Sequence, residues 1–308
     1  MEKHISVLLN EAIEYLNIKE DGNYIDATLG YAGHSKEILK RIPKGFLLAF
    51  DKDIDAIKNS DEVLSKISNN YKIVNTGFIN IKDVALKENF KVNGVLFDLG
   101  ISSPEIDETE RGFSYMKNAT LDMRMDQSAK LSAYDVVNTY PLEDLVRIFR
   151  KYGEEKHARS IANEIVNVRL NKNISTTFEL VDIIDRCYPY KEKRNTHPAK
   201  KVFQALRIEV NNELGEFEKA LTDCLELIEI GSRIVVITFH SLEDKICKNI
   251  FKEYSKIDEV VKGMPNIPDE FKPKFKLVTN KPITPSPSEI NNNKRSKSAK
   301  MRVIEKIR

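Results

Sequence analysis

Short apolar stretches alternate with amphipathic ones over the first hundred residues. The apolar stretches have the length of strands, and the amphipathic ones have the spacing of helices. Strands are expected at residues 23–27, 45–51, 71–75 and 94–99, and helices at 35–41 and 54–67. This succession is typical of βαβ units, in which a parallel sheet is buried on both faces. The pattern therefore predicts an open α/β sheet.

A long helical insertion interrupts this sheet. The next equally apolar stretch, residues 233–239, begins only after 133 residues, whereas a βαβ crossover usually spans a few tens. Helices are expected at residues 142–151, 154–170 and 177–188, and from 198 onward. We therefore predict a sheet domain formed by residues 1–104 and 213–308, with a helical domain of residues 105–212 inserted into it.

Three residues are expected to mark the ends of the inserted helices. Thr177 precedes an apolar stripe and is expected to be an N-cap, and Pro198 suits a first helical position. Gly215 is expected where the last inserted helix gives way to the helix that returns to the sheet. After residue 239 the pattern predicts a further helix, a long loop at 283–298, and two closing strands.

Charge is distributed unevenly along the chain. Residues 291–308 carry seven basic side chains and one acidic one, a charge of +6, so that the remaining 290 residues sum to −4. A second basic cluster lies at residues 191–201. A basic segment on an acidic body is typical of proteins that bind phosphate backbones. A solvated surface tail is the alternative.

Composition narrows the class of protein. A chain of 308 residues with 41% hydrophobic and 31% charged residues is ordinary for a globular protein of about two domains. No apolar run approaches the roughly 18 residues of a membrane span. The three cysteines are widely spaced and form no C-x-x-C pair, which indicates a reducing compartment and disfavours structural zinc. We expect a cytoplasmic protein without a metal site.

A glycine-containing loop, residues 26–35, follows the first expected strand. It contains Gly30 and Gly33 but neither the G-x-G-x-x-G fingerprint nor the G-K-[ST] of a P-loop, so a dinucleotide is disfavoured. Asp51 ends the second strand, where an acid can accept both ribose hydroxyl groups. The two features together favour a nucleoside cofactor over an ordinary βα turn.

A calcium loop is a weaker interpretation of the acids after the second strand. Asp51, Asp53 and Asp55 have the alternate spacing of such a loop, but its sixth position is Ala56 instead of glycine and its eighth is Lys58. Asp53 and Asp55 are expected instead in the first turn of a helix, where negative charge suits the helix dipole.

Two further polar segments follow strands and are expected at the same edge of the sheet. The first begins at Asp98 and the second is residues 239–244, in which Ser241 directly follows His240. No G-x-S-x-G elbow is present, which disfavours a serine hydrolase. Ser241 with Asp244 resembles a variant capping box that opens the next helix.

The chain resembles the bacterial small-subunit ribosomal RNA cytosine-N4 methyltransferases (RsmH, also called MraW). The matching words run nearly from end to end in one order: residues 4–11, 26–35, 96–104, 111–115, 121–126, 197–208 and 239–244. The resemblance implies a class I S-adenosylmethionine-dependent methyltransferase, with a Rossmann-like sheet and a helical insert that recognises substrate. It also implies cofactor contacts from Ala32, Gly33, His34, Asp51, Phe78, Asp98 and Glu105.

The implied reaction is N4-methylation of a cytidine in the decoding region of small-subunit (16S) ribosomal RNA, with the RNA as partner inside the ribosomal subunit. Asp98 and Ser102 are candidate catalytic residues, because acceptors near the amine would take up its proton. Phe113, Tyr115 or Phe239 would pack against the flipped base or else belong to the core. Glu105 departs from the usual glutamine of the family, and Lys294-Arg295 departs from its usual Pro-Arg.

Two alternatives remain at this point. A nucleotide-dependent oxidoreductase could use a similar sheet, although the missing G-x-G-x-x-G counts against it. A non-catalytic RNA-binding protein would leave Asp51 and the glycine loop without a role.

Overall fold

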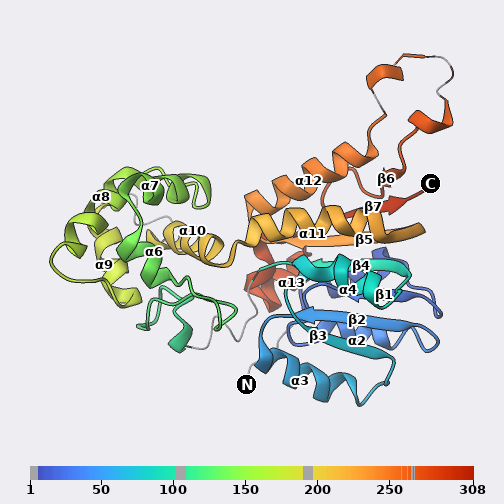
Figure 1. Ribbon diagram of the computed structural model, residues 1–308, viewed down its shortest axis with the longest axis horizontal. Coiled ribbons are helices and arrows are strands. Elements are labelled where there is room, and N and C mark those ends of the chain that lie inside the picture. Colours follow the sequence, from blue (N-terminus) through green and yellow to red (C-terminus); the bar gives the residue numbers. More distant parts are fainter. Residues whose placement is uncertain are drawn as a thin grey trace. The chain divides into compact units, whose positions relative to one another are not determined.

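The computed structural model describes residues 6–100, 109–189, 197–257, 259–261, 263–264, 266 and 268–308. The chain divides into two compact units. The sheet unit comprises residues 1–100 and 214–308, and the helical unit comprises residues 101–213. In Figure 1 the sheet unit runs from blue to cyan and from orange to red, and the helical unit is green to yellow.

The sheet unit contains a seven-stranded sheet in the order β3-β2-β1-β4-β5-β7-β6. Strands β1 to β5 are parallel, β7 is antiparallel to β5, and β6 is antiparallel to β7. The strands are β1 (Asn23–Asp26), β2 (Phe46–Asp51), β3 (Tyr71–Asn75), β4 (Val92–Asp98), β5 (Ile228–Thr238), β6 (Phe275–Leu277) and β7 (Lys300–Lys306). The predicted open α/β sheet and its two closing strands are confirmed, although β5 begins at Ile228 instead of residue 233.

Alternate side chains along the parallel strands enter two separate cores. Ile25, Phe50 and Phe97 face one layer of helices, and all three are fully buried there. Tyr24 and Leu47 face the opposite layer and are equally buried. Burial on both faces explains why these strands are apolar throughout instead of alternating with polar residues.

Helices cover both faces of this sheet (Figure 1). Residues of α1, α2 and α3 belong to one core, and residues of α4, α11 and α12 belong to the other. Their bounds are α1 (Leu9–Leu16), α2 (Gly33–Leu39), α3 (Ile54–Leu64), α4 (Ile81–Lys87), α11 (Glu213–Leu227) and α12 (Ser241–Ser255). The short 3₁₀ helices of the unit are η1 (Phe78–Asn80), η3 (Glu259–Val261) and η4 (Asp269–Phe271). No helix in the described part of the chain is long and apolar enough to cross a membrane.

The expectation of a long loop at residues 283–298 is wrong. The segment contains α13 (Pro287–Asn292) and the 3₁₀ helix η5 (Lys294–Ser298). Ser286 caps α13 by accepting a hydrogen bond from the backbone N–H of Glu289, and Pro287 occupies the first helical position. The proline and serine residues that suggested a loop are therefore the start signal of a short helix.

The helical unit has its own hydrophobic core, formed mainly by five helices and including the fully buried Phe149. These are α6 (Ala133–Thr139), α7 (Leu142–Lys151), α8 (Ala158–Arg169), α9 (Thr177–Arg186) and α10 (Ala199–Asn211), preceded by the 3₁₀ helix η2 (Thr109–Arg111). The predicted helices are confirmed, and α6 is an additional one.

The expected helix ends of the insertion shift by one to three residues. The N-cap of α9 is Thr176 instead of Thr177, and Pro198 is the N-cap residue of α10 instead of its first helical residue. Gly215 lies inside α11, because the helix breaks at Asn212, whose φ of 48° is left-handed. Asparagine tolerates this conformation better than most residues, so no glycine is needed there.

Replacing Thr176 with alanine should lower the free energy of unfolding by about 1 kcal/mol, because it removes a capping box. The Thr176 Oγ1 accepts from the N–H of Glu179, and the Glu179 carboxylate accepts from the N–H of Thr176 at 3.0 Å. Urea denaturation of Thr176→Ala measures the loss. Thr176→Ser keeps the hydroxyl and should retain most of the stability, and equal losses in both variants would contradict the capping role.

Candidate active site

The loop between β1 and α2 is held in an unusual backbone conformation. Gly30 and Ala32 have φ values of 48° and 58°, both in the left-handed region. The buried Asp26 ties this loop together, because its Oδ1 accepts from the N–H of Thr28 at 3.1 Å and its Oδ2 accepts from the hydroxyl of Ser35 at 2.6 Å. The conformation therefore depends on a carboxylate that ends β1.

Gly33 begins α2 at a position where no side chain fits. A Cβ atom there would lie 1.8 Å from the Oγ of Ser6. The next residue, His34, is only 4% exposed, and its Nε2 lies 3.2 Å from the carbonyl oxygen of Val7. Ser6 therefore packs directly against the start of α2, and the imidazole of His34 is buried in the protein.

Asp51 ends β2 beside this loop and joins the two elements. Its Oδ2 accepts from the N–H of Gly30 at 2.8 Å, and its Oδ1 accepts from the N–H of Asp53 at 2.8 Å. Asp53 in turn caps α3 by accepting from the N–H of Asp55. A carboxylate accepts up to about four hydrogen bonds, and these two backbone contacts fix its orientation at the carboxyl edge of the sheet.

Asp98 ends β4 at the same edge. Its backbone N–H donates to the Oγ1 of Thr28 at 2.7 Å, and its Oδ2 lies 3.5 Å from the Nδ1 of His34. Its Oδ1 is buried and has no hydrogen-bond partner within the described residues. Burial, reinforced by the nearby charges of Asp26 and Glu243, raises the pKa of Asp98 well above its ordinary value. A buried acceptor oxygen without a donor is costly unless a ligand supplies one.

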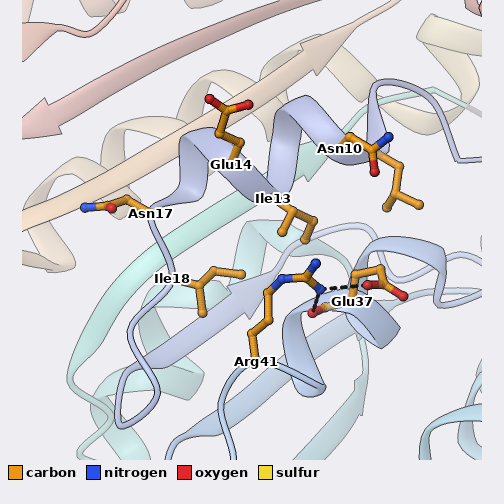
Figure 2. Close-up of a pocket in the computed structure, with 8 residues that line it drawn as sticks. Asn10, Ile13, Glu14, Asn17, Ile18, Glu37 and Arg41 are labelled. Atoms are coloured by element: carbon orange, nitrogen blue, oxygen red, sulfur yellow. Dashed lines mark hydrogen bonds and ion pairs between the residues drawn. The ribbon is translucent and has the colours of Figure 1, made fainter.

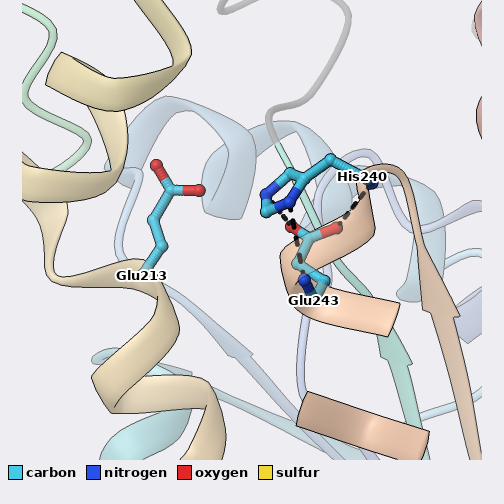
Figure 3. A group of neighbouring side chains, drawn as sticks. All are labelled: Glu213, His240 and Glu243. Atoms are coloured by element: carbon cyan, nitrogen blue, oxygen red, sulfur yellow. Dashed lines mark hydrogen bonds and ion pairs between the residues drawn. The ribbon is translucent and has the colours of Figure 1, made fainter. Parts of the chain in front are cut away.

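The segment after β5 forms a capping box, although not the expected one. His240 is the N-cap of α12, and the Oε2 of Glu243 accepts from the N–H groups of Phe239 at 2.7 Å and His240 at 3.2 Å (Figure 3). The expected pair, Ser241 with Asp244, is wrong, because Ser241 is already the first helical residue. Glu243 is 3% exposed, so this box places a buried negative charge close to Asp98.

Glu213, also drawn in Figure 3, belongs to the helical unit. The guanidinium of Arg207 donates to both of its carboxylate oxygens, each at 2.8 Å.

The residues predicted to bind the cofactor or take part in catalysis divide into three groups. Phe78 lies in η1 after β3, and its ring packs edge-to-face on Phe97 at a centroid distance of 5.9 Å. Ala32, Gly33, His34, Asp51 and Asp98 are brought together by the contacts above. Ser102 and Glu105 lie outside the described residues. Sequence reasoning missed the supporting roles of Asp26 and Ser35, although an aspartate that ends an apolar strand was a signal.

The candidate aromatic residues have different surroundings. Phe113 is 8% exposed and belongs to the core of the helical unit. Tyr115 packs against the ring of His197 at a centroid distance of 4.5 Å and against Phe203. Phe239 is partly exposed and lies beside Gly100, close to the end of β4. Phe239 thus lies at the carboxyl edge of the sheet, whereas Phe113 and Tyr115 belong to the helical unit.

A surface pocket of about 490 Å³ lies between α1 and α2, apart from this edge (Figure 2). The guanidinium of Arg41 spans part of it and donates to the carboxylate of Glu37 at 2.7 Å. The lining residues are Leu9, Asn10, Ile13, Glu14, Asn17, Ile18, Glu37 and Arg41. None of the predicted site residues is among them.

Part of the basic segment at residues 291–308 has a structural role. Asp244 accepts from the Nε of Arg302 at 2.6 Å and from the Nζ of Lys300 at 3.2 Å. Lys306 donates to the carbonyl oxygen of Ile228, and Arg308 donates to that of Asp269. Lys294, Arg295 and Lys297 of η5 are exposed at the surface, as is Arg308.

A mixed seven-stranded sheet with this antiparallel edge, and with a helical insertion, is the fold of the class I S-adenosylmethionine-dependent methyltransferases. The acids at the ends of β2 and β4 lie where open α/β sheets bind their ligands. The chain belongs to the MraW methylase family, whose model matches residues 1–307.

Two relatives match almost the full length of the chain, and both are named ribosomal RNA small subunit methyltransferase H. The protein from Exiguobacterium sibiricum is 49% identical, covering 100% of this chain and 99% of the relative. The protein from Streptococcus mutans is 50% identical, covering 99% of this chain and 98% of the relative.

Solved structures are more distant. An rRNA methylase from Streptococcus thermophilus is 10% identical, with a TM-score of 0.43 over 97% of this chain and 94% of that one. A SAM-dependent O-methyltransferase from Thermotoga maritima is 9% identical, with a TM-score of 0.41 over 97% and 64% of the two chains. Likenesses at this level support no inference about the site.

Proposed function

We propose that this protein transfers a methyl group from S-adenosylmethionine to the N4 amine of a cytidine in the decoding region of small-subunit (16S) ribosomal RNA. The observation that carries the proposal is the unpartnered Oδ1 of Asp98, buried at the carboxyl edge beside the loop that Asp51 orients. Family membership and the names of the two relatives support the same reaction.

The residues at this edge fit a nucleoside cofactor. Asp51 would accept the ribose hydroxyl groups, and the backbone of Ala32 and Gly33 would lie against the methionine part. The partly exposed ring of Phe78 offers an apolar contact for the adenine. When bound, S-adenosylmethionine supplies an electrophilic methyl group on a positively charged sulfur.

The protein's contribution to the chemistry is alignment and proton acceptance. The N4 amine of cytosine is a weak nucleophile, because its lone pair is delocalised into the ring, so in-line positioning accounts for much of the acceleration. Asp98 would accept a hydrogen bond from the amine and then its proton, with Ser102 as the other candidate acceptor. Phe239 would stack on the cytosine after it has left its helix.

The two alternatives make different demands on this site. An oxidoreductase must cradle a pyrophosphate, and the loop from Gly30 to Gly33 has no G-x-G-x-x-G turn for it. A non-catalytic RNA-binding protein has no use for a buried carboxylate oxygen that lacks a donor, since such an atom costs free energy.

The deciding experiment combines two measurements. Calorimetry should detect binding of S-adenosylmethionine but not of NADH, which separates a methyltransferase from an oxidoreductase. Incubation with radiolabelled cofactor and small-subunit ribosomal RNA should then yield N4-methylcytidine after nuclease digestion. Methyl incorporation into another position would refute the N4 assignment, and cofactor binding without incorporation into RNA or assembled subunits would refute the RNA substrate.

The cellular compartment and the form of the RNA substrate are part of the same proposal. We infer that the protein acts in the cytoplasm on RNA within the ribosomal subunit, and that the helical insert recognises this substrate. The three cysteines are unpaired, with the pKa of Cys224 and Cys247 raised by burial, so these two are unreactive core residues. They fit a protein that does not depend on disulfides.

Changing Lys294, Arg295 and Lys297 together to glutamine should weaken RNA binding and make the slope of log affinity against log salt shallower by about two to three units. The reason is that these exposed bases precede β7 and would each contact one phosphate. Fluorescence anisotropy over a range of KCl concentrations measures the slope. Affinity for S-adenosylmethionine should not change, and an unaltered slope in a folded triple variant would contradict the phosphate contacts.

A further inference from the structure

Two segments about fifty residues apart in the sequence meet on the surface of the helical unit. They are the end of α7 and the first turn of α10. A Cβ atom on Gly153 would lie 2.6 Å from the carbonyl oxygen of Lys201, and the Gln204 side chain donates to the carbonyl of Tyr152 at 2.9 Å. The Nζ of Lys201 donates to the carbonyl of Glu154 at 2.8 Å. These contacts bring together four exposed bases, here called the insert patch: Arg150, Lys151, Lys200 and Lys201.

The four basic side chains of the insert patch form no ion pair with a carboxylate of the described residues. Among the described residues, no carboxylate lies within 4.0 Å of any of its four cationic groups, although the exposed Glu154 is a neighbour in sequence. Elsewhere in the same unit four exposed bases do have such partners: Arg147 with Asp144, Arg159 with Glu143, Lys172 with Glu179, and Arg186 with Glu164. Like charges that gather without counter-charges repel one another and attract a polyanion.

The helix dipole stabilises the positions of Arg150 and Lys151 but not those of Lys200 and Lys201. Arg150 and Lys151 end α7, where cations suit the negative end of the helix dipole. Lys200 and Lys201 are in the opposite situation, because they lie in the first turn of α10, which contains no acid. The first turns of α6, α7 and α9 contain acids, as the dipole favours, whereas that of α8 contains none. Lys200 and Lys201 are therefore placed against the dipole.

Long, exposed cations that have no carboxylate partner among the described residues suit phosphate groups better than base edges, because phosphate contacts need charge and reach but no fixed pattern of donors. The ring of Tyr152 lies beneath the Nζ of Lys151, 5.0 Å from its centroid, and adds an aromatic surface. We propose that the insert patch binds the phosphate backbone of the RNA substrate and so sets affinity for RNA without taking part in methyl transfer. This inference rests on the proposed function and assigns one surface of the insert to it.

The test compares two double variants of the full chain. Arg150→Gln with Lys200→Gln removes two charges that have no ion-pair partner, and Arg159→Gln with Lys172→Gln removes two that are paired with glutamates. The probe is fluorescently labelled small-subunit ribosomal RNA, titrated at several KCl concentrations. The first variant should bind at least about fivefold more weakly, with a salt slope shallower by about one to two units, whereas the second should bind like the wild type.

A second readout separates RNA binding from a structural role. Lys200→Gln alone should melt at the wild-type temperature or above it, because the charge opposes the helix dipole. At saturating RNA the methyl-transfer rate of the double variant should equal that of the wild type, with only KM raised. A lower melting temperature together with an unchanged salt slope would overturn the inference.

Two other outcomes would also overturn the inference. One is equal weakening of RNA binding in both double variants. The other is an unchanged RNA slope accompanied by loss of binding to phosphatidylserine vesicles, which would assign the insert patch to a lipid surface. Failure of the wild-type protein to methylate any RNA would instead refute the proposed function, and the binding measurements would still decide the role of the insert patch.

Discussion

Asp98→Asn should slow methyl transfer by about a hundredfold or more while leaving the protein at least as stable as the wild type at neutral pH. The loss follows from removing a proton acceptor, a role that typically contributes about 10²–10⁴ in rate. The amide keeps the size of the carboxylate, so the packing at the end of β4 should persist. Single-turnover kinetics with saturating cofactor measures the chemical step.

The stability part of this prediction follows from the direction of the pKa shift. Burial and the charges of Asp26 and Glu243 raise the pKa of Asp98 in the folded protein. A group with a raised folded pKa stabilises the fold when protonated, and this contribution is lost as pH rises from the ordinary aspartate range through the raised value. The wild type should therefore lose stability relative to Asp98→Asn over that interval, and the two melting temperatures should converge in acid.

A matched control is Asp83→Asn, an exposed acid in the first turn of α4. It should retain the wild-type rate. If Asp98→Asn also turned over at the wild-type rate, the carboxylate would be dispensable. If its rate and its melting temperature at neutral pH both fell, Asp98 would have a structural role instead.

Asp51→Ala should weaken binding of S-adenosylmethionine at least about tenfold. Hydrogen bonds to a charged acceptor contribute about 1.5–3 kcal/mol each, and about 1.4 kcal/mol corresponds to a factor of ten. The variant also deprives the Gly30 N–H of its acceptor, so the loop loses the contact that joins it to β2. Calorimetric titration with the cofactor measures the effect.

The matched control for Asp51→Ala is Asp55→Ala. Asp55 is a nearby acid in the first turn of α3, and it is exposed. Its cofactor affinity should remain that of the wild type. Unchanged affinity in Asp51→Ala would remove this residue from the site. Binding of adenosine alone should fall in parallel, because the expected contact is to the ribose.

The sheet could be predicted because β1, β2 and β4 are largely buried on both faces and are therefore mostly apolar, and because the less buried β3 keeps β-branched residues. Residues 46–51 and 71–75 form strands within one residue of the expected bounds. The start of β5 could not be predicted, because Glu229 and Ile230 are exposed and lie in an irregular stretch between the paired residues Ile228 and Arg233. The helix α1 was missed because its apolar face, including Ala12 and Leu16, is short.

The candidate site, like the sheet, could be predicted only in part from the sequence. Asp51 and Asp98 end apolar strands, and parallel strands bring their carboxyl ends to one edge, so sequence placed both acids there. The raised pKa of Asp98 was not predictable, because it depends on burial in the folded protein and on the charges of Asp26 and of Glu243, which is 145 residues away in the chain. Helix caps were misplaced by one residue at Thr176 and His240, because several neighbouring side chains can serve as caps.

The position of β7 affects how the sheet can form during synthesis. This strand is the last of the seven in the sequence, yet it lies between β5 and β6 and pairs with both. Until the ribosome has released β7, the apolar β5 has an open edge next to an unattached β6. Open edges of apolar strands promote aggregation. We therefore expect β5 to be most prone to edge-to-edge association until residues 300–306 have emerged.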